Sequence, residues 1–287
     1  FQLFNQSGGG WPLTMFLDEN AIPFMAGTYF PKIPSHGLPS FKEVVLKVAE
    51  TYKQQREEII KQSSIISKSL TLKKSNVLNQ DLENLLQNII VNLDKKKGGY
   101  IGAPKFPLYN IYDTLLYFYT KSKNSDYLEP VQLILKQLCS QGIYDHVEGG
   151  LARYTVDENW LIPHFEKMLY DNAQFVLLTS KFLKINKSEY FEKKTIQTIE
   201  FMNKNFLNSE YNLLGSAYDA DSDGEEGKYY IFHYDELSKI KDIDQYFEIK
   251  SEGNWENKII LKEIKTPPES IVVELKKLRK TKNKPFF

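Results

Sequence analysis

The sequence predicts a mainly α-helical fold, in which successive helical hairpins follow a short β-hairpin. Beyond Ser40, apolar residues recur every three or four positions, which is the spacing of an amphipathic helix. Long loops rich in glycine, tyrosine and acidic residues separate these helices, and three of them open alike, at Gly98, Gly142 and Gly215. We interpret this likeness as a weak internal repeat. Hairpins that each bury one face must close into a bundle, a solenoid or a toroid.

The first 40 residues differ from the rest of the chain. Residues 13–17 and 23–30 are short apolar runs on either side of a turn, and they predict a β-hairpin. A glycine-rich loop at residues 7–12 precedes this hairpin. Three prolines between residues 31 and 39 follow it and indicate an extended linker.

The remaining elements are expected to be mostly helices. Ser40 and Glu43 have the spacing of a capping box, which predicts that a helix begins there. Cys139, the one cysteine of the chain, lies in an apolar helical run and is expected to be a buried structural thiol. Strand-like runs occur at 229–233 and 259–261. Further helices are predicted at 82–93, 108–121, 127–141, 164–183, 188–206 and 269–280.

The amino-acid composition and net charge indicate which kinds of partner the protein is expected to bind. The chain has 287 residues, of which 41% are hydrophobic and 26% charged, as in a soluble globular protein of one large or two ordinary domains. Its 37 basic and 37 acidic residues cancel, so we expect neither nucleic acid nor a membrane as the main partner. No apolar run approaches the roughly 20 residues that cross a bilayer, and we expect a cytoplasmic protein. The high aromatic content suits sites that stack flat polar ligands such as sugars, and the alternative, which we expect for most of these residues, is a large core.

The central loop and the helix predicted after it, residues 142–172, hold the first candidate catalytic residues. His164 and Asp171 are seven residues apart and would share one face of the predicted helix. A histidine beside a carboxylate can act as a general base at neutral pH. The alternative is a histidine that only hydrogen-bonds a loop carbonyl. Asp145 and His146 form a second acid–histidine pair, and its alternative is an Asx turn with an exposed histidine.

The same loop carries candidate ligand-binding residues. Arg153 and Tyr154 can hold a carboxylate or sugar hydroxyls, with Trp160 as a stacking platform. The alternative is that Arg153 simply pairs with Asp157 or Glu158.

Two other loops supply the remaining candidates. Asp219 and Asp221 begin a segment that looks like a calcium loop, but Tyr230 stands where an EF-hand requires glutamate, and we expect no metal. The alternatives are a looser cation site and a solvated acidic turn. The two acids stand next to Tyr218 and are predicted to bind a ligand, and Lys105 is expected to reach the same rim. The central and third loops should leave the helices at one end, so all these residues are predicted to converge on one concave face. The sequence contains no nucleotide-binding, zinc-binding or nucleophile-elbow motif, and we expect no cofactor.

Several motifs together resemble a known family. They are residues 7–17 (SGGGWPLTMFL), 26–31 (AGTYFP), 102–107 (GAPKFP), 142–147 (GIYDHV), 160–173 (WLIPHFEKMLYDNA), 219–228 (DADSDGEEGK) and 253–256 (GNWE). In this order they resemble the thioredoxin-domain-containing (DUF255) family typified by spermatogenesis-associated protein twenty. The resemblance implies a thioredoxin-like domain fused to an (α/α)6 toroid, which is similar to those of sugar 2-epimerases and six-hairpin glycosidases.

This resemblance places the domains and suggests alternative functions. Residues 1–70 would be the C-terminal part of the thioredoxin-like domain, with Pro12 at the family's cis-proline position, and residues 71–287 the N-terminal part of the toroid. The chain looks like a fragment without the family's Cys-x-x-Cys-type motif and without the later hairpins. The predicted function is acid–base chemistry on a sugar, with His164 as the acid or base and Asp171 or Asp145 as its orienting partner. The alternatives are a redox or chaperone-type protein with the toroid as a scaffold for an unknown protein partner, and a non-catalytic interaction domain.

Overall fold

The computed structural model describes residue 10, residues 12–70 and residues 82–287. Most of the predicted loop at residues 7–12 lies outside these residues, and so does the peptide bond before Pro12. The chain divides into two compact units, residues 1–79 and 80–287, which are described separately.

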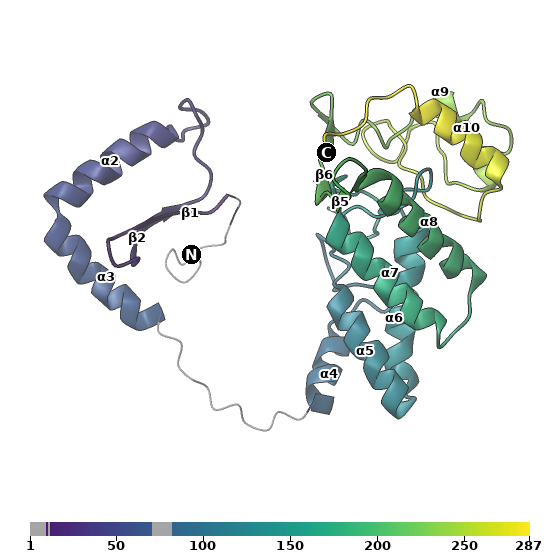
Figure 1. Cartoon of the computed structure of the whole chain (residues 1–287), viewed down its shortest axis with the longest axis horizontal. Coiled ribbons are helices and arrows are strands. Elements are labelled where there is room, and N and C mark those ends of the chain that lie inside the picture. The colour runs from purple at the N-terminus through teal and green to yellow at the C-terminus, as the bar shows by residue number, and fades with distance from the viewer. Residues whose placement is uncertain (1–9, 11, 71–81) are drawn as a thin grey trace. The chain divides into compact units, whose positions relative to one another are not determined.

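The first unit contains the predicted β-hairpin and a pair of helices. Strands β1 (Thr14–Leu17) and β2 (Pro23–Gly27) are antiparallel, and they are followed by helices α2 (Phe41–Gln54) and α3 (Arg56–Leu70) (Figure 1). The predicted capping box is present, because Ser40 Oγ accepts a hydrogen bond from the Glu43 amide while the Glu43 carboxylate accepts one from the Ser40 amide. Leu13, just before β1, and Leu17, at its end, are exposed, as is typical of a hairpin with open edges.

The second unit consists mainly of helices, so the predicted class is confirmed. Helices α5 and α6 form one hairpin, α7 and α8 form the next, and α5 packs against α7 (Figure 1). The helices are α4 (Leu82–Val91), α5 (Tyr109–Ser122), α6 (Ser125–Ser140), α7 (Leu169–Leu183), α8 (Glu189–Asn205), α9 (Tyr234–Leu237) and α10 (Glu269–Arg279), with a 3-10 turn at Ile243–Gln245. None of the described helices combines the length and the apolar character that a membrane span requires.

The main core of the second unit lies between these two hairpins. Leu115 of α5, Ile134 and Leu138 of α6, and Phe175 and Phe182 of α7 are among its fully buried members. The apolar residues that recur at helical spacing in the sequence thus lie on the buried faces of α5, α6 and α7. Removing such side chains from water provides most of the stability of this part of the chain, at about 1.5–3 kcal/mol for each large apolar side chain.

Cys139 belongs to this core, as predicted. Its thiol is completely buried, and burial raises its pKa to about 12. Because only the thiolate reacts, we expect a disulfide reagent such as 5,5′-dithiobis(2-nitrobenzoate) to label Cys139 no faster than this unit unfolds. Labelling within seconds in native buffer would contradict this expectation. A Cys139→Ala variant, which should not react at all, is the control.

Among the described residues of this unit, short two-residue strands pair within and between the loops at the ends of the helices. Strand β3 (Lys167–Met168) pairs with β6 (Ala217–Tyr218), and so joins the central loop to the third one. The other pairs are β4 (Leu207–Asn208) with β5 (Leu213–Leu214), and β7 (Asp221–Ser222) with β8 (Glu225–Glu226). The strand predicted at 229–233 does not form: Tyr229 and Tyr230 lie in a turn, and only Phe232 bridges to Ile259.

The helix predicted to begin at residue 164 begins instead at Leu169, and this prediction was wrong. The preceding residues are extended, because their backbone groups bond across the loop rather than along a helix. The His164 amide donates to the Tyr154 carbonyl at 3.0 Å, and the Arg153 amide donates to the Glu166 carbonyl at 2.9 Å. His164 and Asp171 therefore do not share a helical face.

Candidate functional site

Two glycines hold the central loop close to its neighbours. A Cβ on Gly142 would lie 2.0 Å from the carbonyl oxygen of Leu161, so only glycine fits there. Gly149 has a φ of +87°, and a Cβ on it would lie 2.7 Å from the Gln197 carbonyl oxygen in α8. These two glycines thus let the loop pack against its own chain and against α8.

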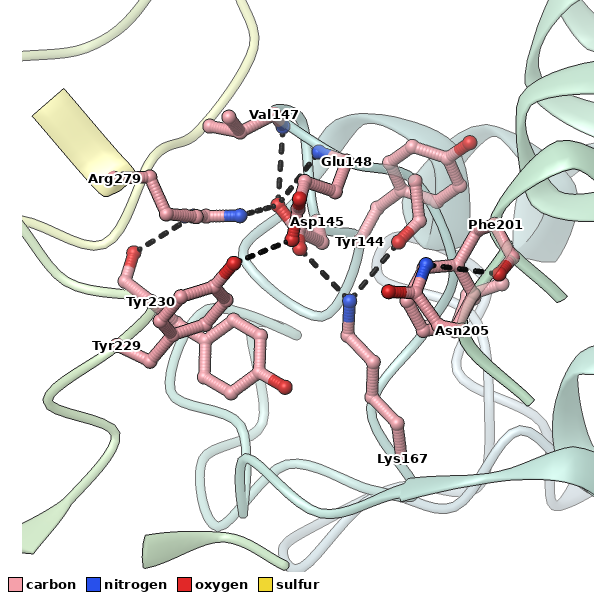
Figure 2. Close-up of polar contacts among 12 residues, drawn as sticks. Tyr144, Asp145, Val147, Glu148, Lys167, Phe201, Asn205, Tyr229, Tyr230 and Arg279 are labelled. Carbon is pink, nitrogen blue, oxygen red and sulfur yellow. Dashed lines mark hydrogen bonds and ion pairs between the residues drawn. The ribbon is translucent and has the colours of Figure 1, made fainter. Parts of the chain in front are cut away.

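Asp145 lies at the centre of a buried ionic cluster (Figure 2). Its carboxylate accepts hydrogen bonds from Lys167 Nζ at 2.8 Å and from the Arg279 guanidinium, which α10 carries into the loop. Burial alone would raise the pKa of Asp145, but the charges of Arg279 and Lys167 outweigh it and hold that pKa below its usual value. The same carboxylate accepts bonds from the amides of Val147 and Glu148, in the Asx-turn geometry of the alternative interpretation.

The cluster leaves little room for a ligand. The cavity beside Asp145 has a volume of about 30 Å³, which is the space of a water molecule rather than of a sugar. Asp145 was predicted as a possible orienting partner of His164. Because this cluster encloses its carboxylate, it does not take that role. It joins the central loop to α10.

His146 is buried as well and is neither exposed nor open to a ligand. Its Nε2 lies 3.0 Å from the Gln141 carbonyl oxygen, and its Nδ1 lies 3.3 Å from Glu263 and from Lys194. Burial, together with the Lys194 charge, lowers the pKa of His146. Lys194 and Glu263 themselves form a buried ion pair of 2.7 Å. The predicted ligand-binding role of His146 conflicts with this enclosure.

Trp160 and Lys105 also differ from their predicted roles. Trp160 is completely buried, and its Nε1 donates to the Lys97 carbonyl at 2.8 Å, so its ring cannot stack a ligand. Lys105 is buried beside it, where Nζ donates to the Gly98 carbonyl and lies 3.2 Å from the Asp94 carboxylate. The two side chains brace the first loop instead of lining a rim.

His164 lies at the surface in a column of aromatic rings. Its ring stacks on Tyr154 with 5.0 Å between centroids, and Tyr154 stacks on Phe106 at 4.5 Å. His164 Nδ1 is 2.9 Å from Glu226 Oε1, so its carboxylate partner comes from β8 and not from Asp171 or Asp145.

The third loop thus reaches His164 through Glu226. Asp219 and Asp221, the two acids predicted to bind a ligand, are exposed near this contact. Neither of them lines the cleft described next, and their predicted role stays a prediction.

An open cleft lies where α5 and α7 begin, and we call it the Asp171 cleft. Its volume is about 400 Å³, within the range of small-molecule sites. It brings together two of the predicted residues, Arg153 and Asp171, while Tyr154 stacks on the lining residue Phe106 and His164 lies beyond Tyr154. The lining residues are Phe106, Pro107, Leu108, Tyr109, Asn110, Ile111, Arg153, Tyr170, Asp171 and Gln174.

Two polar atoms of the cleft are buried without a partner. Asp171 Oδ2 and Tyr109 Oη have no hydrogen-bond partner among the residues that the structure describes, and the two residues are only 7% and 4% exposed. Burial raises the pKa of Asp171 to about 7, against the opposing influence of Arg153 and with a small contribution from Glu166. A carboxyl group of this kind exchanges a proton near neutral pH.

Sequence reasoning missed most of the cleft lining. Phe106, Tyr109, Asn110, Tyr170 and Gln174 were assigned to no site. Tyr109 carries a usable signal, since it is a tyrosine on the buried face at the first turn of a helix. The left-handed backbone of Leu108 (φ 46°), which positions this turn, has no signature in the sequence.

Comparison with known proteins places the chain in context. Residues 1–71 match the family model Thioredox_DsbH, described as "Protein of unknown function, DUF255". The chain is 32% identical to human spermatogenesis-associated protein 20 over 82% of its own length and 32% of that protein. The rat protein of the same name is 32% identical over 77% of this chain and 30% of the relative. The chain therefore belongs to the family of spermatogenesis-associated protein 20, as its motifs predicted. The chain spans about a third of the length of these relatives.

Among solved structures, two similar chains are cellobiose 2-epimerases. The enzyme from Spirochaeta thermophila has a TM-score of 0.41 and 15% identity, over 50% of this chain and 42% of that one. The enzyme from Bacillus thermoamylovorans has a TM-score of 0.41 and 18% identity, over 48% of this chain and 41% of that one.

Proposed function

We propose that the Asp171 cleft binds a small hydroxylated ligand of the sugar class, and that Asp171 transfers a proton to or from it. The observation that carries this proposal is a buried carboxyl oxygen without a partner, at the wall of an open cleft, with a pKa of about 7. Buried polar atoms without partners are rare in native proteins and call for an explanation. A ligand that completes their hydrogen bonds supplies one.

The rest of the lining suits a sugar. Phe106 and Tyr170 expose aromatic surface at the edge of the cleft, where a pyranose ring can stack. Asn110, Gln174 and Arg153 offer amide and guanidinium groups that can bond hydroxyls. Tyr109 Oη adds a donor beside Asp171. A mainly apolar cleft with a few convergent polar groups is the usual composition of such a site.

This proposal moves the acid–base role from His164 to Asp171. His164 is separated from the cleft by the ring of Tyr154 and is occupied by Glu226. The redox alternative finds no support in Cys139, because its thiol is buried and its pKa is raised to about 12.

The test is a binding screen followed by a turnover assay. Ligand-observed NMR with a panel of mono- and disaccharides should show binding to the native protein, and none to Asn110→Trp, in which a large ring fills the cleft. Thr114→Trp places the same ring one turn further along α5 on an exposed position and should bind as the native protein does. For a sugar that is converted, Asp171→Asn should lower the turnover about 10²–10⁴-fold. Binding that survives Asn110→Trp would show that the ligand site lies elsewhere.

A further inference from the structure

The N-termini of two helices, which carry partial positive charge, lie at the wall of the Asp171 cleft. Helices α5 and α7 both begin at its wall, and each is longer than three turns. The first turn of a helix presents backbone N–H groups without intrahelical acceptors, and the helix dipole adds a partial positive charge. In α6 and α8 the side chains of Asn124 and Ser188 cap these groups. No described side chain caps α5 or α7 in this way, although the first amide of α7, that of Leu169, donates to the Ser216 carbonyl at 2.9 Å.

Arg153 adds a full positive charge at the same place. Its side chain is 42% exposed, and its nearest carboxylate is that of Glu166, at 3.3 Å. A guanidinium group has five donors in a planar fork, so the bond to Glu166 and the interaction with the Tyr170 hydroxyl leave further donors for a ligand.

The unpartnered groups point to the same kind of ligand. Tyr109 Oη is a hydroxyl, and the neutral carboxyl of Asp171 is also a hydroxyl donor, so both can bond an acceptor oxygen. The cleft wall therefore combines a guanidinium, two uncapped helix ends and two buried donors without partners. Oxygen acceptors that carry negative charge suit the guanidinium, the remaining first-turn amides and the two buried donors.

We propose that the ligand of the Asp171 cleft carries an anionic group, a carboxylate or a phosphate, bound by Arg153 and the first turns of α5 and α7. The ligand class is thus an acidic or phosphorylated sugar rather than a neutral one. This inference rests on the proposed function, because it specifies the ligand of the same cleft.

Acidic groups near the anion set the pH dependence of its binding. The titratable groups that face it are Arg153 and Glu166 of the central loop, Tyr109 of α5, and Tyr170 and Asp171 of α7. Only Asp171 among them has a pKa raised to about 7. When Asp171 ionises it loses its donor and repels the anion, so the affinity for a carboxylate ligand such as glucuronate, whose own charge is constant in this range, should fall as the pH rises from 6 to 8.

The experiment compares three ligands by isothermal titration calorimetry at pH 6: glucose, glucuronate and glucose 6-phosphate. We expect at least one of the two anionic sugars to bind more than tenfold tighter than glucose, and which one it is distinguishes a carboxylate from a phosphate site. Arg153→Gln should remove this preference, and Arg153→Lys should retain part of it. Thermal unfolding of each variant checks that it is folded.

The outcomes separate the two proposals. Equal affinity for all three sugars, or a preference that Arg153→Gln leaves unchanged, overturns the anionic ligand and leaves the sugar site in place. Binding of none of these sugars, nor of the wider neutral panel, overturns both proposals.

Discussion

Replacing Asp145 with alanine should lower the free energy of unfolding of the second unit by about 3–5 kcal/mol, because two buried cations then lose their counter-charge. Lys167 and Arg279 are both buried against this carboxylate. Arg279 also brings α10 onto the central loop, so its release should loosen the C-terminal part of the chain. Urea denaturation followed by circular dichroism at pH 7 measures the change.

The matched control breaks an exposed ion pair in the same unit. Lys181 and Asp113 lie 2.6 Å apart, but their side chains are 44% and 40% exposed, so Asp113→Ala should cost no more than about 1 kcal/mol. If both variants lost the same free energy of unfolding, the buried Asp145 cluster would contribute no more to stability than an exposed ion pair. The pH dependence gives a second check. The pKa of Asp145 is lowered in the folded state. Its contribution to the free energy of unfolding should therefore be fully present above the pKa of an ordinary aspartate, and should be lost only as the pH falls below that value.

Asp171 should change the stability with pH in the opposite direction to Asp145. Its pKa is raised from 3.8 to about 7 in the folded state, so between these values the native state binds more protons than the unfolded state. Stability attributable to Asp171 should therefore fall as the pH rises from about 4 to 7, by up to about 4 kcal/mol. Asp171→Asn removes this titration and should be more stable than the native protein at pH 8.

The difference between the two proteins, measured by urea denaturation at each pH, isolates this one group. Glu129→Gln, which removes an exposed carboxylate of α6, should run parallel to the native protein at every pH. Parallel curves for the native protein and Asp171→Asn would show that Asp171 titrates as an ordinary aspartate, and the proposed proton transfer would lose its basis.

Local signals predicted the fold well where they agreed with the packing. The apolar period located α5 and α6, and the capping box fixed the start of α2 at Phe41. The start of α7 was misplaced by five residues. There, hydrogen bonds from the central loop hold the backbone of His164 extended, and no local pattern records such long-range bonds.

The site was harder to predict than the fold. Arg153 and Asp171 were identified by residue type, but the environment that raises the pKa of Asp171 arises from the packing of α7 against α5, about 60 residues away. Asp145, Lys105 and Trp160 have the residue types of a binding site, yet the structure uses them as buried braces. Residue type and spacing alone do not separate a carboxylate that faces two cations from one that faces a cleft.

The most direct test of the central claim is the pKa of Asp171 itself. A ¹³C NMR titration of the side-chain carboxyl carbon, assigned by its loss in Asp171→Asn, follows this one group from pH 3 to pH 9. The structure leads us to expect an inflection near pH 7, because burial disfavours the charged form. An inflection near pH 4, the value of an ordinary aspartate, would contradict a proton-transfer role for this cleft.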